Sequence, residues 1–178
     1  AYQAGLRESA ARGMMSTPSE EENAETGNTV ITDGSHIRNG RLKPNITYLS
    51  GENNYIYKTN QKGLITNAHT DNLQLKKHDG RLTHKNNTYG KLAGDHAGHL
   101  FGDRFGGSPK LDNLVSQAQR VNLSEYKVLE NQWVSALKED KNVSVDIEIY
   151  YDNDNSRPTK FKVCYKIDGI KYICMITN

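Results

Sequence analysis

Apolar and polar residues alternate along two stretches of the chain, and this pattern predicts two groups of antiparallel strands. The first stretch, residues 45–75, alternates between clusters of Gly and Asn, as in a meander of short strands joined by tight turns. The second, residues 143–177, alternates through three strands, the first of which places on one face Val143, Val145, Ile147 and Ile149. A short apolar run at residues 29–32 predicts one further strand.

The spacing of apolar residues changes between these two stretches. Residues 123–139 carry apolar side chains three or four positions apart, at Tyr126, Leu129, Trp133 and Leu137, which is the spacing of one face of an α-helix. Residues 76–94 contain many turn-forming residues and few apolar ones, so we expect a long loop there. The order of strands, irregular segment, helix and strands indicates an α+β fold rather than alternating βαβ units.

Length and charge divide the chain into two parts. Its 178 residues suit one domain, but residues 1–28 are acidic and poor in apolar residues, so we interpret them as a flexible linker, with residues 2–15 able to form a short helix. Because the chain does not begin with Met, we expect it to belong to a longer protein. Two Arg and five Glu give the linker a charge of −3, and since the whole chain carries +2, residues 29–178 carry +5. This basic body suits a polyanionic ligand, although ordinary surface Lys residues would produce the same charge.

Two kinds of architecture are disfavoured by the sequence. No run approaches the ~18 apolar residues of a membrane span, so we expect no membrane insertion. Cys164 and Cys174 flank Asp168-Gly169, which predicts a two-residue hairpin turn. That turn pairs residue 164 with residue 173, so the two Cys side chains are expected to point to opposite faces and to remain free thiols.

Candidate catalytic residues are concentrated in residues 94–133, a segment that begins rich in Gly and leads into the predicted helix. It contains His96, His99, Arg104, Asn113, Asn122 and Glu130. Hydrolysis of a phosphodiester needs a base, a cation that stabilises the transition state, and donors that position the phosphate. His suits the base because its pKa lies near neutral pH. Mg²⁺ prefers oxygen ligands and keeps several waters, so one Asn oxygen is enough to fix it when substrate and water supply the rest.

Two motifs in this segment are "GDHAGHLFGDRFGG" (residues 94–107) and "LDNLVSQAQRVNLSEYKVLENQW" (residues 111–133). Together they resemble the DNA/RNA non-specific endonucleases of the ββα-metal, or His-Me finger, class, and in particular the branch found as C-terminal toxin domains of bacterial secreted proteins. The resemblance extends over residues 44–178. The chain departs from the family pattern at three positions, with His96 in place of Asp, Ala97 in place of Arg and Ser116 in place of Pro.

The resemblance implies an α+β nuclease domain over residues 29–178, with antiparallel sheets, a ββα-metal finger core and one main helix. In such a site His99 is the general base and Asn122 binds the catalytic metal, Mg²⁺ or Mn²⁺. Glu130 reaches the metal through water or orients its shell. Arg104 would supply the positive charge that is missing at Ala97. The residues expected to bind substrate phosphate, or to position the base, are Arg104, Asn113 and Gln117.

The resemblance also implies a biological role. The domain is expected to be a metal-dependent endonuclease that cleaves DNA, and RNA as well, with little sequence preference. It would be the toxin domain of a secreted bacterial protein, exported by the producer and active in the cytoplasm of a target cell. Because this activity would kill the producer, a cognate immunity protein is implied as a partner.

Other interpretations of the same residues stay open at the level of sequence. Asn122 and Glu125 fit a capping box, Glu130 could be a solvated helix residue, and Tyr126 and Trp133 are expected to be core residues. Five His residues within 31 positions could instead bind Zn²⁺: His69, His78, His84, His96 and His99. The basic body could also belong to a non-catalytic polyanion-binding module, which a Mg²⁺-dependent nicking assay would distinguish from a nuclease.

Overall fold

The computed structural model describes residues 29–178, so the linker and short helix expected within residues 1–28 lie outside the described part of the chain. Its strands are β1 (Ile37–Arg38), β2 (Arg41–Leu42), β3 (Thr47–Ser50), β4 (Tyr55–Thr59), β5 (Ile65–Thr70), β6 (His96–His99), β7 (Leu114–Gln117), β8 (Val143–Tyr151), β9 (Pro158–Ile167) and β10 (Ile170–Thr177). Its helical elements are η1 (Asp103–Phe105), η2 (Leu111–Asn113), η3 (Val121–Glu125) and α3 (Tyr126–Lys138).

Six strands form one antiparallel sheet in the order β10-β9-β8-β5-β4-β3. The two predicted groups of strands are confirmed, since residues 45–75 give β3 to β5 and residues 143–177 give β8 to β10. The groups join where β5 pairs with β8, with Ala68 opposite Ile147. The strand predicted at residues 29–32 is reduced to a single bridge between Ile31 and Tyr48.

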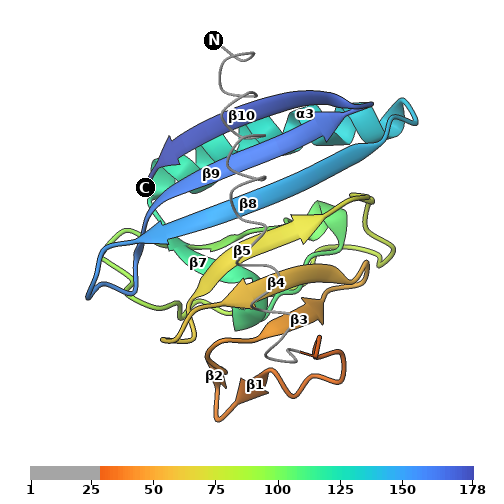
Figure 1. Cartoon of the computed structure of the whole chain (residues 1–178). Coiled ribbons are helices and arrows are strands. Elements are labelled where there is room, and N and C mark those ends of the chain that lie inside the picture. The colour runs from red at the N-terminus through yellow and green to blue at the C-terminus, as the bar shows by residue number, and fades with distance from the viewer. Residues whose placement is uncertain (1–28) are drawn as a thin grey trace, which may run out of the picture.

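The single main helix, α3, covers one face of this sheet and runs behind β8, β9 and β10 in Figure 1. Trp133 of α3 is fully buried, and its ring contacts the rings of Tyr126 and Tyr165 edge-on. The four alternating residues of β8 are buried beneath the helix layer, as predicted: Val143, Val145, Ile147 and Ile149. Burial of each large apolar side chain contributes roughly 1.5–3 kcal/mol, so this contact is the main reason that the helix stays on the sheet.

The segment expected to be irregular contains a second, two-stranded sheet. β6 pairs with β7 in antiparallel fashion, with His96 opposite Gln117 and His99 opposite Leu114. Because α3 follows β7 through η3, the three elements form the ββα finger that the family resemblance implied. Each of these strands has only four residues, too few for alternation to reveal them in the sequence. The α+β fold, with mostly antiparallel strands and one main helix, is confirmed.

Buried Tyr hydroxyls attach the finger to the sheet and the helix. A buried Tyr hydroxyl needs a hydrogen-bond acceptor, and four Tyr hydroxyls donate to acceptors within residues 100–113. Tyr48 donates to Asp112 O at 2.6 Å, Tyr55 to Phe105 O at 2.6 Å, Tyr57 to Asn113 Oδ1 at 2.8 Å, and Tyr126 to Leu100 O at 2.6 Å. The alternation that builds β3 and β4 therefore also holds the segment that follows His99.

Two further expectations concern the hairpin and the membrane. Asp168 and Gly169 have φ angles of +47° and +81°, as a type I′ turn requires, and Cys164 lies opposite Ile173. Cys164 and Cys174 are both free, which confirms the predicted register. In the described part of the chain, no helix is long and apolar enough to cross a membrane.

Candidate active site

A cleft of about 400 Å³ lies between the finger and the loop that joins β5 to β6. Its lining residues are Lys76, Arg81, His99, Gly102, Asp103, Arg104, Asn122, Leu123, Tyr126, Lys127 and Glu130. The three residues expected to act on water and on the metal, His99, Asn122 and Glu130, therefore share one surface. Arg104 lines the same cleft, whereas Asn113 and Gln117 do not.

His99 is the last residue of β6, and its ring is largely covered. The ring of His84, from the long loop, packs against it with 4.8 Å between the centroids and an angle of 62° between the planes. Burial lowers the pKa of His99 to about 4, and the charges of His84 and Arg81 act in the same direction while Asp103 opposes them. The imidazole is therefore neutral at neutral pH and can accept a proton from water.

Asn122 lies in η3, a single π-helical turn whose closing hydrogen bond spans five residues. No side chain caps η3 or α3, so the capping box suggested by Asn122 and Glu125 does not form. Instead, Asn122 Nδ2 donates a hydrogen bond to His96 Nδ1 at 3.0 Å. A regular helix would place Asn122 about 80° away from Glu130, and the smaller rotation per residue of the wider turn brings the two closer to alignment.

Glu130 projects from α3 into the cleft without a protein partner. Burial raises its pKa to about 7, against the opposing charges of Arg104, Lys127 and Arg81. Among the described residues no hydrogen bond or ion pair reaches its carboxylate, and Gly102 leaves the space for it, since a Cβ at that position would lie 2.1 Å from Glu130 Oε2. A covered carboxylate is costly as an anion unless a cation compensates it.

The donor set fits the metal that the family resemblance implied. Within residues 29–178, Asn122 Oδ1 has no hydrogen-bond partner, because the contact with His96 uses the amide nitrogen. One amide oxygen and the carboxylate of Glu130 suit Mg²⁺, which is commonly held by few protein ligands and several waters. Asn122 and Glu130 would thus hold a hydrated, oxygen-ligated divalent cation.

Four cationic side chains line the cleft together with Asn122 and Glu130: Lys76, Arg81, Arg104 and Lys127. Only Arg104 was identified from the sequence. Arg81 lies in a loop without periodic pattern, and the fold brings it to the cleft because Leu82 N–H donates to Asp103 Oδ1 at 3.1 Å. Arg81 and Arg104 therefore both add positive charge to the cleft lining, and Arg104 Nη1 also donates to Asn131 Oδ1 at 2.7 Å.

Asn113 and Gln117 lie behind the cleft and are fully buried. Asn113 Nδ2 donates to Phe101 O at 2.7 Å and its Oδ1 accepts from Phe101 N–H at 3.0 Å. Gln117 packs against Gly98, where a Cβ would lie 2.0 Å from Gln117 Oε1. Asn113 thus fixes the backbone of Phe101, two residues after His99, whereas the buried amide of Gln117 has no hydrogen-bond partner among the described residues.

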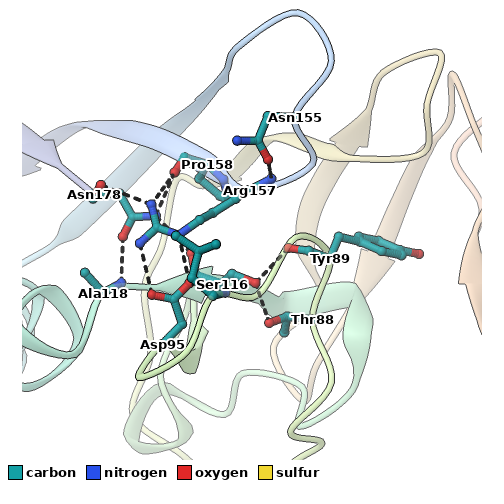
Figure 2. Close-up of polar contacts among 10 residues, drawn as sticks. Thr88, Tyr89, Asp95, Ser116, Ala118, Asn155, Arg157, Pro158 and Asn178 are labelled. Atoms are coloured by element: carbon teal, nitrogen blue, oxygen red, sulfur yellow. Dashed lines mark hydrogen bonds and ion pairs between the residues drawn. The ribbon is translucent and has the colours of Figure 1, made fainter.

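Two part-buried contacts connect the outer end of the finger to the large sheet (Figure 2). Asp95, which precedes β6, forms a bidentate ion pair with Arg157. Arg157 Nε donates to Asp95 Oδ2 at 2.7 Å, and Arg157 Nη2 donates to Asp95 Oδ1 at 3.0 Å. Asn178, which follows β10, accepts a hydrogen bond from Ala118 N–H at 2.8 Å and donates to Ser116 O at 3.0 Å. The first residue of β6 and the last of β7 are therefore fixed relative to the sheet.

Of the five His residues considered for zinc, His84 and His99 pack together, but the others lie elsewhere or bond to other partners. His69 bonds to Asp146 on the sheet at 3.0 Å, and His78 lies between Glu52 and Asp103 beside the cleft. The described residues contain no group of three or more His, Cys, Asp or Glu side chains placed to hold a metal ion. The zinc-binding interpretation therefore has no support in the part of the chain that the structure describes.

Comparisons with known proteins identify the family to which this chain belongs. The family model of the DNA/RNA non-specific endonucleases matches residues 44–169, which include every residue of the cleft. The chain is 37% identical over 162 residues to the type VII secretion system protein EssD of Staphylococcus aureus strain USA300, and equally to EssD of strains NCTC 8325 and Newman. Each match covers 84% of this chain but 26% of the relative, so the chain spans about a quarter of the length of these proteins. The chain belongs to the family of DNA/RNA non-specific endonucleases.

Proposed function

We propose that residues 29–178 form a metal-dependent endonuclease domain that hydrolyses phosphodiester bonds of DNA and RNA with little sequence preference. The observation that carries this proposal is the convergence of His99, Asn122 and Glu130 on one cleft lined by Lys and Arg. Cationic side chains match phosphates, and contacts to phosphate carry no direct information about base identity. A cleft of this composition therefore suits any nucleic acid strand that fits into it.

Each residue then has a defined task. His99 accepts the proton of the attacking water, which a neutral, largely covered imidazole can do at neutral pH. Arg81 and Arg104 hold the scissile phosphate. Asn122 Oδ1 and the Glu130 carboxylate, directly or through water, hold Mg²⁺ or Mn²⁺. When bound, such a metal stabilises the charge that develops on the phosphate and on the leaving 3′ oxygen. Water attacks phosphorus directly, so no covalent intermediate on the protein is needed.

We further propose that the domain is the toxin portion of a secreted bacterial protein. The similarity to EssD, a type VII secretion system protein, supports export from the producing cell. A nuclease without sequence preference would damage the nucleic acids of its producer, so a cognate immunity protein is expected to inhibit it there. Its site of action would be the cytoplasm of a target cell, where nucleic acid is accessible.

The experiment that tests the activity is incubation of the purified protein with plasmid DNA and with total RNA, in Mg²⁺ with and without EDTA. Nicking and RNA degradation are expected only without EDTA. His99→Ala should remain folded and lose roughly 10²–10⁴-fold in rate, the usual contribution of a positioned base. His69→Ala is the matched control, because that imidazole lies on the sheet. Binding of DNA without cleavage would instead identify a non-catalytic polyanion-binding module.

A second pair of variants tests the metal ligand. Asn122→Ala should be nearly inactive and insensitive to added Mg²⁺ while its melting temperature stays close to that of the wild type. Asn122→Asp retains an oxygen ligand but adds a negative charge beside the incoming phosphate, so it should be impaired less than Ala. Asn86→Ala, in the exposed loop, is the control. An active Asn122→Ala variant would show that the metal is held elsewhere.

A further inference from the structure

His96 and Asn122 are joined by one hydrogen bond across the finger. Asn122 Nδ2 donates to His96 Nδ1 at 3.0 Å, although the two residues are 26 positions apart in the chain. An Asn amide carries an oxygen acceptor on one side and two N–H donors on the other, and only the oxygen can bind a cation. Among the described residues, Asn122 has no other side-chain hydrogen bond. Its contact with His96 therefore decides which side of the amide faces the cleft.

We propose that His96 is a positioning residue for the metal site. Its Nδ1 accepts the hydrogen bond from Asn122 Nδ2 and so directs Asn122 Oδ1 toward the cation held with Glu130. For this His96 must carry its proton on Nε2 and leave Nδ1 as an acceptor. The inference rests on the proposed role of Asn122 as a metal ligand. Contacts that orient a ligand without touching the metal commonly determine its affinity.

The backbones of both partners are held in place independently of this hydrogen bond. Asp95, next to His96, is part of the ion pair shown in Figure 2. Asn122 N–H donates to Ala118 O at 3.1 Å, and Ala118 N–H in turn donates to Asn178 Oδ1 at 2.8 Å. Because the two main chains are fixed, loss of the His96 acceptor should change the orientation of the Asn122 amide more than the fold of the finger.

The test is Mn²⁺ binding without nucleic acid, measured from the electron paramagnetic resonance signal of free Mn²⁺. His96→Leu removes the acceptor. His96→Asn is the matched variant, because Asn is close to Leu in shape and places a neutral amide oxygen near the former Nδ1. We expect the Leu variant to bind Mn²⁺ about 10–100-fold more weakly than the wild type, the usual effect of removing such a contact. The Asn variant should recover most of the affinity, and DNA cleavage by the three proteins should follow the same order.

The outcomes are distinguishable. A folded Leu variant with wild-type affinity, or an Asn variant as weak as the Leu variant, would overturn the role of His96. Asn122→Ala is included as a reference, because wild-type affinity in that variant would disprove the metal site itself and this inference with it. If the Leu variant does not fold, nuclear magnetic resonance of the wild type decides. A scalar coupling between Asn122 Nδ2 and His96 Nδ1 is expected, and its absence would refute the hydrogen bond.

Discussion

The low pKa of His99 predicts how acid destabilises this protein. Burial, with the charges of His84 and Arg81, lowers that pKa from 6.5 in an unfolded chain to about 4 in the folded protein. Between these values the unfolded chain binds a proton at His99 that the folded protein does not. Stability attributable to this residue is therefore fully present above pH 6.5 and is lost as the pH falls toward 4. Replacement of His99 by Asn, which does not titrate, should remove this dependence.

The magnitude follows from the same two pKa values. At pH 5 almost all of the unfolded chain is protonated at His99 and little of the folded protein is, so the linkage relation predicts a loss of about 2 kcal/mol relative to pH 8. Well below pH 4 this loss of stability reaches its limit of about 3 kcal/mol. For a domain of this size, 2 kcal/mol corresponds to about 4–8 °C in melting temperature. This is large enough to measure by either urea or thermal unfolding.

The assay is urea unfolding of the wild type and His99→Asn at pH 5, 6, 7 and 8, with EDTA present so that no metal binds. Other titrating groups are common to both proteins and cancel in the difference. The stability of the wild type relative to the variant should fall by about 2 kcal/mol between pH 8 and pH 5. His69→Asn is a control of opposite sign. The hydrogen bond that His69 donates to Asp146 raises the pKa of His69, so the stability that His69 contributes is lost as the pH rises. Parallel curves for the wild type and His99→Asn would refute the conclusion that the folded protein keeps this imidazole neutral.

Three further predictions follow from other parts of the structure. Both Cys thiols should react in the denatured, unreduced protein, and a mass lower by two hydrogens would contradict the observed hairpin register. Arg157→Met should lower the free energy of unfolding by about 1–3 kcal/mol, because it leaves the part-buried carboxylate of Asp95 unpaired. A loss below about 1 kcal/mol, typical of exposed ion pairs, would disprove this. Gly102→Ala should weaken Mn²⁺ binding with little change in the melting temperature, because the new methyl displaces only the end of Glu130, and unchanged binding would exclude Glu130 from the metal site.

The sequence by itself determined the features that depend on neighbouring residues. Apolar spacing located α3, alternation located the strands from β3 to β5 and from β8 to β10, and Asp168-Gly169 predicted the turn that keeps the thiols apart. These features are local because helix and hairpin geometry repeats over a few residues. The motif residues His99, Asn122 and Glu130 were also recognisable in the sequence, since one short stretch of chain contains them all.

Only the tertiary structure decided what surrounds those residues. Pairing of β5 with β8 and of β6 with β7 joins segments whose partners no local pattern specifies. The loop before β6 has no periodicity, so nothing in the sequence showed that Arg81 would enter the cleft or that His84 would cover His99. His96 was visible as a departure from the family motif, but its hydrogen bond to Asn122 depends on the folded finger. Burial depends on all the segments packed around a residue, and it sets the pKa values of His99 and Glu130. The sequence alone could therefore identify these side chains but not their protonation state.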